Sequence, residues 1–229
     1  DFSVSPDHTK LLYSVDFDGS ERYTAYVKNL ETGELLADQV TNTFGDLEWL
    51  ADSERFLYLE RTDADIRPVR ACLHTLGEEE DTVLYTEDDT MFFMGLSKSR
   101  DGKYIFLRST SQLTSEVQYL EAASATPAFT SILPREHGHE YSVDHHEGEW
   151  YITTNADGAR NFKLVKAQID APEKENWEEV VPAQAEVLLS GIDIFKDFFC
   201  VYEVKEAVDY VKIVPFGGEP FYVDIPEAA

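Results

Sequence analysis

Cysteine is scarce in this sequence, whose 229 residues include Cys72 and Cys200 and no other. Small domains that depend on disulfides use more cysteines in a shorter chain, so the sequence excludes a disulfide scaffold. Both cysteines lie within apolar runs, Ala71-Cys72-Leu73 and Phe199-Cys200-Val201. We therefore predict two buried, reduced thiols, which fits a reducing compartment.

Long apolar runs are also missing, and so is the pattern of a signal peptide. No run approaches the ~20 residues that cross a bilayer, and no basic segment precedes an apolar one at the start. The sequence begins with Asp1 rather than Met, which we interpret as a segment of a longer chain. We expect no membrane partner and a cytoplasmic location. A periplasmic location stays open, because targeting information can precede Asp1.

Basic residues are few. The sequence has 19 Lys and Arg residues and 45 Asp and Glu residues, which gives a formal net charge of -26. Such a surface repels phosphate backbones and anionic membranes, so we expect no nucleic-acid partner. The acidity either attracts cationic peptides or simply keeps the protein soluble, and solubility is the simpler interpretation.

What is present is a repeat of apolar segments. Hydrophobic residues make up 43% of the chain, enough for a large core. A turn followed by a strongly apolar strand recurs five times at intervals of 45 to 50 residues, and the residues that we align are Tyr13, Tyr58, Phe106, Ile152 and Tyr202. This interval is typical of β-propeller blades, which have four strands each and repeat every ~40–50 residues.

Each repeat also contains a third strand with alternating polarity and a short fourth strand. The second strand is the most apolar, as expected where neighbouring blades cover both of its faces. We predict an all-β propeller of about five four-stranded antiparallel blades, with units near 1–40, 41–88, 89–136, 137–183 and 184–229. A β-sandwich would also have many short strands, but it would not predict this period. We expect no amphipathic helix, and a solvated loop over 170–180.

Short motifs follow one another along these repeats. The first repeat contains Asp16-Phe17-Asp18-Gly19-Ser20-Glu21 before Tyr23, and then Asn29-Leu30-Glu31-Thr32-Gly33. The later motifs are His74-Thr75-Leu76-Gly77 with Asp81, Thr114-Ser115-Glu116-Val117, His139-Glu140-Tyr141-Ser142-Val143-Asp144-His145, and Asn161-Phe162. In this order they resemble the propeller of the oligopeptidase B family and, more loosely, that of prolyl oligopeptidase.

The resemblance implies a seven-bladed propeller that caps an α/β-hydrolase domain carrying a Ser/Asp/His triad. This sequence contains no G-x-S-x-G nucleophile motif, and its nearest string is Met94-Gly95-Leu96-Ser97-Lys98-Ser99. The catalytic domain and about two blades are therefore expected outside this chain, which we predict to be inactive alone. Whether five blades close into a ring or form an open arc is not decided by the sequence.

The same resemblance implies the partners. The parent enzyme would cleave short peptides after Arg or Lys, and the propeller would act as a gate that excludes folded proteins. We expect the α/β-hydrolase domain of the same parent and short basic peptides as partners. The alternative is a stand-alone propeller that binds peptides or proteins, and the coding sequence beyond Ala229 discriminates between the two.

The resemblance also singles out Glu21. It would place this carboxylate on a loop that faces the hydrolase domain, where it could pair with an arginine of that domain or with a basic substrate. An exposed turn residue is the equally simple interpretation. We assign no catalytic, cofactor-binding or metal-binding residue, and a triad built from the chain's own Ser, His and Asp has no local signature.

Three other groups of residues could carry chemistry. Histidines 137, 139, 145 and 146, with acidic neighbours at 136, 140, 144 and 147, lack a zinc spacing, so we interpret them as a polar loop. The carboxylate runs Glu79-Glu80 and Glu87-Asp88-Asp89 are interpreted as structural turns. The repeated aromatic residues Tyr13, Tyr58, Tyr104, Phe106 and Tyr151 are expected in the core rather than on a stacking surface.

Overall fold

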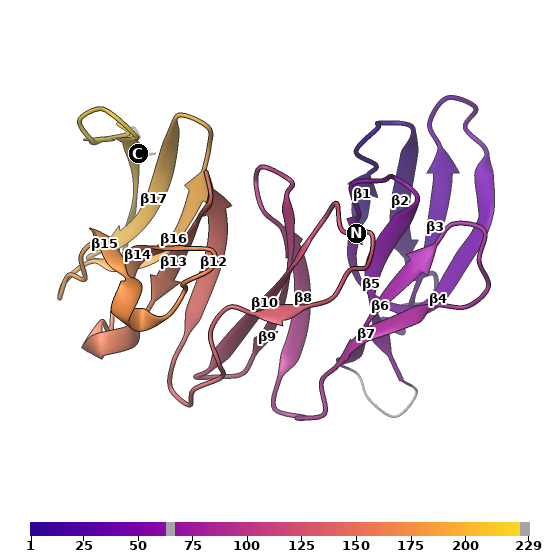
Figure 1. Cartoon of the computed structure of the whole chain (residues 1–229), viewed down its shortest axis with the longest axis horizontal. Coiled ribbons are helices and arrows are strands. Elements are labelled where there is room, and N and C mark those ends of the chain that lie inside the picture. Colours follow the sequence, from indigo (N-terminus) through magenta and orange to yellow (C-terminus); the bar gives the residue numbers. More distant parts are fainter. Residues whose placement is uncertain (63–66, 225–229) are drawn as a thin grey trace. The chain divides into compact units, whose positions relative to one another are not determined.

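Antiparallel sheets dominate the computed structural model, which describes residues 1–62 and 67–224 (Figure 1). Helical structure within these ranges is limited to two 3₁₀ turns, Ala156–Gly158 and Lys174–Asn176. No helix among the described residues is long and apolar enough to cross a membrane. The chain divides into two compact units, 1–112 with 116–132, and 113–115 with the residues from 133 onward.

The first unit contains three blades. Strands β1 to β7 form one seven-stranded sheet in sequence order, and β8 to β11 form a separate four-stranded sheet. The bounds of the first seven are β1 Phe2–Val4, β2 Lys10–Val15, β3 Tyr23–Asn29, β4 Leu35–Trp49, β5 Arg55–Arg61, β6 Pro68–Thr75 and β7 Thr82–Thr86. Those of the third blade are β8 Phe93–Lys98, β9 Tyr104–Thr110, β10 Ser115–Glu121 and β11 Thr130–Ser131.

One strand joins the first two blades. β4 serves as the outer strand of the first blade and continues as the inner strand of the second, across the predicted boundary between residues 40 and 41. The sequence led us to expect separate strands here. The register against β5 shifts between Thr43 and Leu47, and Gly45 between them has φ +114, a conformation that glycine tolerates best. A bend within a continuous strand therefore replaces the expected break between two strands.

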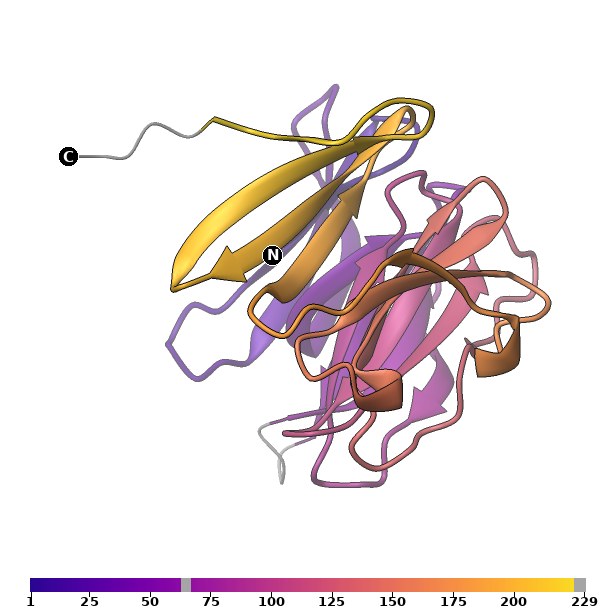
Figure 2. The same ribbon diagram turned by 90° about the vertical axis from the view of Figure 1, so that its left-hand side faces the viewer.

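The second unit contains two four-stranded sheets, β12–β15 and β16–β19. Their bounds are β12 Tyr141–His146, β13 Glu149–Thr154, β14 Lys163–Gln168, β15 Glu178–Val181, β16 Leu188–Ile194, β17 Phe198–Lys205, β18 Val208–Pro215 and β19 Phe221–Tyr222. The last sheet, gold in Figure 2, has a long β17–β18 hairpin and the short edge strand β19. The loop expected over 170–180 contains one 3₁₀ turn before β15 begins at Glu178.

The core lies between consecutive sheets within each unit. Leu12, Val27, Phe56 and Tyr58 pack together between the first and second blades. Leu57 and Leu59, on the opposite face of β5, pack against Ile105 and Leu107 of the third blade. In the second unit Tyr151 and Leu164 pack against Phe199 and Val201. These layers confirm the predicted fold class, an all-β propeller in which successive sheets cover one another's faces.

The aligned residues of the repeat all lie in second strands, but two of them are shifted by one position. Tyr58 packs toward the preceding blade, whereas in β9 the residues that do so are Ile105 and Leu107, so Phe106 lies on the other face. In β17 the equivalent residue is Val201 rather than Tyr202. Because side chains alternate in a strand, a slip of one residue exchanges the two faces.

The second strands are strongly buried in four blades, as predicted. β2 is the exception, since its buried residues Leu12 and Ser14 alternate with half-buried Tyr13 and Val15. Tyr58, Phe106 and Tyr151 are core residues, while Tyr13 and Tyr104 are half-buried. Cys72 and Cys200 are free, buried thiols, as the sequence indicated.

Candidate functional site

The loop from Asp16 to Glu21 connects β2 and β3 and is organised by one carboxylate. Asp16 accepts hydrogen bonds from the backbone N–H groups of Asp18 (3.0 Å), Gly19 (2.9 Å) and Glu21 (2.8 Å). Burial opposes ionisation of Asp16, but these N–H donors outweigh it and lower the pKa of the carboxyl. The sequence D-x-x-G-x-E therefore encodes a local turn in which the aspartate replaces missing backbone partners.

Glu21 is fixed through its backbone rather than its side chain. It has φ +58, its N–H is held by Asp16, and its carbonyl accepts a hydrogen bond from the guanidinium of Arg61 at the end of β5. Arg61 is only 6% exposed, whereas the Glu21 side chain is exposed and Phe17 in the same loop is 81% exposed. The loop thus presents a carboxylate and an aromatic ring to solvent on a braced backbone.

Two further buried polar groups, Arg67 and Glu87, flank β6 and β7. The guanidinium of Arg67 donates to the carbonyl oxygens of Glu87 (3.2 Å) and Phe92 (3.5 Å). The Glu87 side chain accepts a hydrogen bond from the N–H of Asp89 and is 4% exposed. The run Glu87-Asp88-Asp89 is therefore a structural turn as predicted, but Glu87 is buried rather than solvated.

The opposite ends of these blades carry a repeated turn. In the β1–β2 turn the Ser5 hydroxyl donates to Asp7 (2.6 Å) and accepts from the N–H of Lys10 (2.9 Å). In the β8–β9 turn Ser99 does the same with Asp101 (2.8 Å) and Tyr104 (3.0 Å). The hydroxyl of Ser5 and the N–H and hydroxyl of Thr9 hold the pKa of Asp7 well below its usual range.

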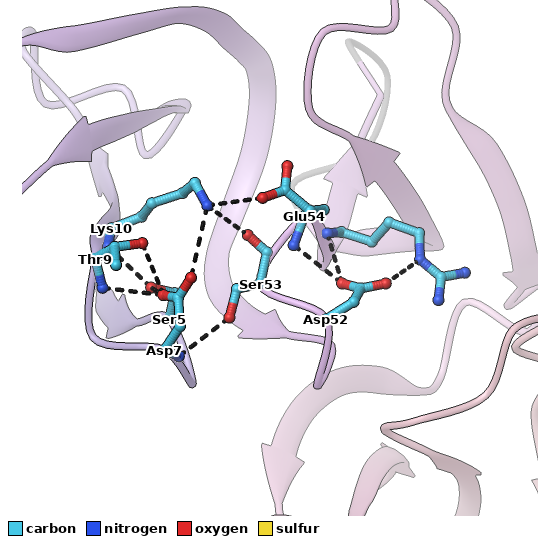
Figure 3. Close-up of polar contacts among 8 residues, drawn as sticks. Ser5, Asp7, Thr9, Lys10, Asp52, Ser53 and Glu54 are labelled. Carbon is cyan, nitrogen blue, oxygen red and sulfur yellow. Dashed lines mark hydrogen bonds and ion pairs between the residues drawn. The ribbon is translucent and has the colours of Figure 1, made fainter.

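The β1–β2 turn is tied to the β4–β5 turn of the next blade (Figure 3). The Asp7 N–H donates to the Ser53 hydroxyl (3.1 Å), and the Lys10 ammonium binds Glu54 (2.9 Å). The next link is made by Arg55, whose guanidinium donates to the carbonyl oxygens of Ser124 (2.8 Å) and Ala125 (3.2 Å). These contacts join turns of neighbouring blades within the first unit, so we interpret them as structural.

A groove of about 600 Å³ lies in the first unit over β4, β5 and β6. On its floor His74 is held between two carboxylates, with Nδ1 2.7 Å from Asp81 and Nε2 3.2 Å from Asp38. Tyr58 donates to the second oxygen of Asp81 (2.6 Å). Burial and this contact raise the pKa of Tyr58 far above its usual value, and burial raises the pKa of the neighbouring Cys72 to about 11.

Sequence reasoning missed this groove as a feature. His74 and Asp81 entered only as part of a family motif, and Asp38 not at all, because the three lie on different strands or loops. Both ring nitrogens of His74 lie within hydrogen-bond distance of a carboxylate oxygen. The cluster is fully paired, so its clearest role is to join β4, β6 and the turn before β7.

The four histidines of the 137–146 segment do not converge. His139 is buried, bonds Thr154 through Nε2 (2.8 Å) and stacks on Tyr141, and burial lowers its pKa. His145 accepts from the N–H of Gly148 (3.1 Å), His146 stacks on Phe216, and His137 is exposed. Across residues 1–62 and 67–224 no group of three His, Cys, Asp or Glu side chains is placed to hold a metal ion.

The segment that comes nearest to a nucleophile motif forms part of a strand and a turn. Residues Phe93–Lys98 form β8, where Ser97 pairs with Phe106 of β9, and Ser99 begins the turn described above. A nucleophile elbow needs a sharp turn from a strand into a helix, which this segment does not form.

Comparisons with known proteins agree with the fold. The family model described as prolyl oligopeptidase, N-terminal beta-propeller domain, matches residues 1–228. Dipeptidyl aminopeptidase BI of Pseudoxanthomonas mexicana is 37% identical over 100% of this chain, which covers 32% of that protein. Protease 2 of Moraxella lacunata is 33% identical over 82% of this chain, and the matched region is 29% of that protein.

Solved structures of oligopeptidases contain a domain with the same fold as this chain. Oligopeptidase B from Leishmania major superposes with a TM-score of 0.90 over 100% of this chain, at 26% identity, and is covered to 34%. Oligopeptidase B from Trypanosoma brucei superposes with a TM-score of 0.89 at 26% identity. The chain thus spans about a third of the length of the relatives that it matches.

Proposed function

Because this chain belongs to the family of prolyl oligopeptidase N-terminal β-propeller domains, we propose that it is the gating propeller of a serine oligopeptidase that cleaves short peptides after Arg or Lys. The observation that carries the proposal is the match over residues 1–228 to a propeller that occupies about a third of much longer peptidases. The other two-thirds would supply the Ser/Asp/His triad.

The gating role follows from how such a triad must be protected. A serine peptidase without steric control hydrolyses any accessible chain, whereas a cap over the site admits only peptides that fit the enclosed space. The first unit suits such a cap, because its sheets are tied by core packing and by the contacts between its turns. A rigid cap excludes folded proteins by size.

Specificity for Arg or Lys is supported by two observations. The likeness to oligopeptidase B extends over the whole chain, and the net charge of -26 would draw cationic peptides toward the enzyme. The attraction is long-range, so it would raise the association rate at low salt and be screened at high salt.

Glu21 is the residue that we propose to contact the catalytic domain. Its braced backbone and exposed carboxylate would form an ion pair that exists only when the two domains close. The rival function, a stand-alone binding propeller, predicts no such partner, and the coding sequence beyond Ala229 separates the two.

The test uses the longer protein and peptides that contain a single arginine. We expect kcat/KM to fall steeply as the peptide lengthens, and a folded protein with an exposed arginine to resist cleavage. Equal cleavage of short peptides and folded proteins would refute the gate. Equal cleavage after arginine and after its neutral isostere citrulline would refute the specificity.

Replacing Glu21 tests the contact. In the longer protein Glu21→Gln should lower kcat/KM about two- to fivefold, the effect of losing a surface ion pair of ~0.5–1 kcal/mol, and the loss should vanish at high salt. The matched control is Glu31→Gln, an exposed glutamate in the β3–β4 turn at the other end of β3. An equal loss in both variants would contradict a specific contact.

A further inference from the structure

A buried carboxylate without a full set of partners lies in the last sheet. Glu203 of β17 is 4% exposed. Its Oε2 accepts a hydrogen bond from the Tyr222 hydroxyl (2.8 Å), while no described residue donates to its buried Oε1. A buried carboxylate that lacks a donor carries a large desolvation cost, so native structures almost always provide one.

The second blade has a carboxylate at the equivalent position, and there it is paired. Glu60 of β5 and Glu203 of β17 occupy the same place in their strands, four residues after Phe56 and Phe199 respectively, which both begin the buried face. Glu60 lies opposite Arg70 of the third strand and forms an ion pair with it (2.8 Å). Glu203 lies opposite Tyr210, which carries no charge. The carboxylate is present in both blades, but its cation is missing from the last one.

The chain itself does not supply that cation. The segments 63–66 and 225–229 contain no Lys, Arg or His. Lys212 lies on the same face of the sheet, but its ammonium is directed to the Tyr222 ring, 5.7 Å from the centroid. Lys205, two residues after Glu203 on the same face, is exposed near the hairpin turn.

The surroundings of Glu203 suit a basic side chain. Tyr210 and Tyr222 lie on the same face, with ring centroids 6.2 Å apart, and are 41% and 53% exposed. Tyrosine faces attract guanidinium and ammonium groups, most strongly where water is excluded. Tyr222 belongs to β19, an edge strand of two residues, so the site lies at the edge of the sheet.

We propose that Glu203, Tyr210 and Tyr222 form a binding site for an arginine or lysine side chain, carried by a segment of the longer protein that packs beside β19. A permanent partner is favoured over a transient one, because the carboxylate is buried within the sheet and needs its cation in the resting state. The relatives extend over about three times the length of this chain, so a segment of this kind has room to exist.

The probe for the site is the peptide acetyl-Gly-Arg-Gly-amide, titrated against the 229-residue chain at physiological ionic strength. The control peptide carries citrulline, which keeps the shape of arginine without its charge. We expect the arginine peptide to bind about tenfold more tightly, since a charge-assisted hydrogen bond contributes at least this factor. Binding of both peptides with the same affinity, or of neither, would overturn the proposal.

Variants of the chain test whether the preference for the arginine peptide depends on Glu203. Glu203→Gln should abolish the preference for arginine, and the matched control Glu60→Gln, whose carboxylate is already paired with Arg70, should keep it. Tyr222→Phe removes the donor to Oε2 but leaves the charge, so the preference should persist. A preference that survives Glu203→Gln would show that the overall acidity of the chain, not this site, binds the peptide.

Measurements on the longer protein test whether one of its own segments fills the site at Glu203. If one of its own segments fills the site, the arginine peptide will not bind it, and Glu203→Gln will lower its thermal midpoint more than that of the 229-residue chain. Peptide binding to the longer protein with the affinity of the isolated chain would contradict an internal partner. This outcome is independent of the proposed gating role, because neither measurement involves catalysis.

Discussion

Single carboxylates decide much of the local structure of this acidic chain. Asp16 and Asp7 organise turns by accepting several hydrogen bonds each, and Asp38 and Asp81 hold a histidine between them. The motif Asp16 to Glu21 could be recognised from the sequence because its partners are adjacent along the chain. The His74 cluster could not, because Asp38 lies 36 residues away and reaches His74 only after the strands have paired.

The turn carboxylate Asp7 makes the stability of the first unit depend on pH. Its pKa is lower in the folded chain than the ~3.9 of an unfolded aspartate, so its contribution is present above about pH 4 and is lost as the pH falls through the folded value. Asp7→Asn should therefore lower the thermal midpoint at pH 7, and its difference from wild type should shrink below about pH 4.

Ser5→Ala provides the control for this prediction, since the Ser5 hydroxyl is the strongest donor to Asp7. It should reproduce the pH dependence in weaker form, and the double variant should cost less than the sum of the two single changes. A constant difference between Asp7→Asn and wild type from pH 7 to pH 2 would rule out the proposed role of Asp7.

At the scale of strands and sheets, the apolar runs predicted the second and third strands of every blade to within a few residues, and the short fourth strands of every blade but the first. Two features escaped prediction for physical reasons. The continuity of β4 depends on a bend at Gly45 that no local signal distinguishes from a turn. The faces of Phe106 and Tyr202 depend on register, which is fixed by packing against the neighbouring sheet.

Packing between sheets should dominate the stability of the first unit. Ile105 is fully buried between the second and third blades, so Ile105→Ala should lower the free energy of unfolding by about 2–5 kcal/mol, and Ile105→Val by about 0.5–1.5 kcal/mol. Leu35→Ala, at a position 56% exposed on the first blade, should change it by less than about 0.5 kcal/mol. Denaturant unfolding measures all three, and equal effects at the two positions would contradict this core.

At the scale of the whole molecule, the repeat and the order of the motifs were sufficient to predict a propeller and its family. What the sequence could not show was which carboxylates are buried. Glu87 and Glu203 look like ordinary acidic residues in the sequence, yet both are 4% exposed. Burial is set by neighbours from other strands, such as Tyr222 beside Glu203, so it becomes visible only when the sheets are assembled.

We propose that this chain is the propeller of a peptidase whose catalytic groups lie in the rest of the longer protein. The most direct measurement is the hydrolysis of a chromogenic arginyl substrate by the purified 229-residue chain and by the longer protein. We predict no turnover by the chain, and turnover by the longer protein that a serine-directed reagent abolishes. Turnover by the chain alone, blocked by the same reagent, would contradict it.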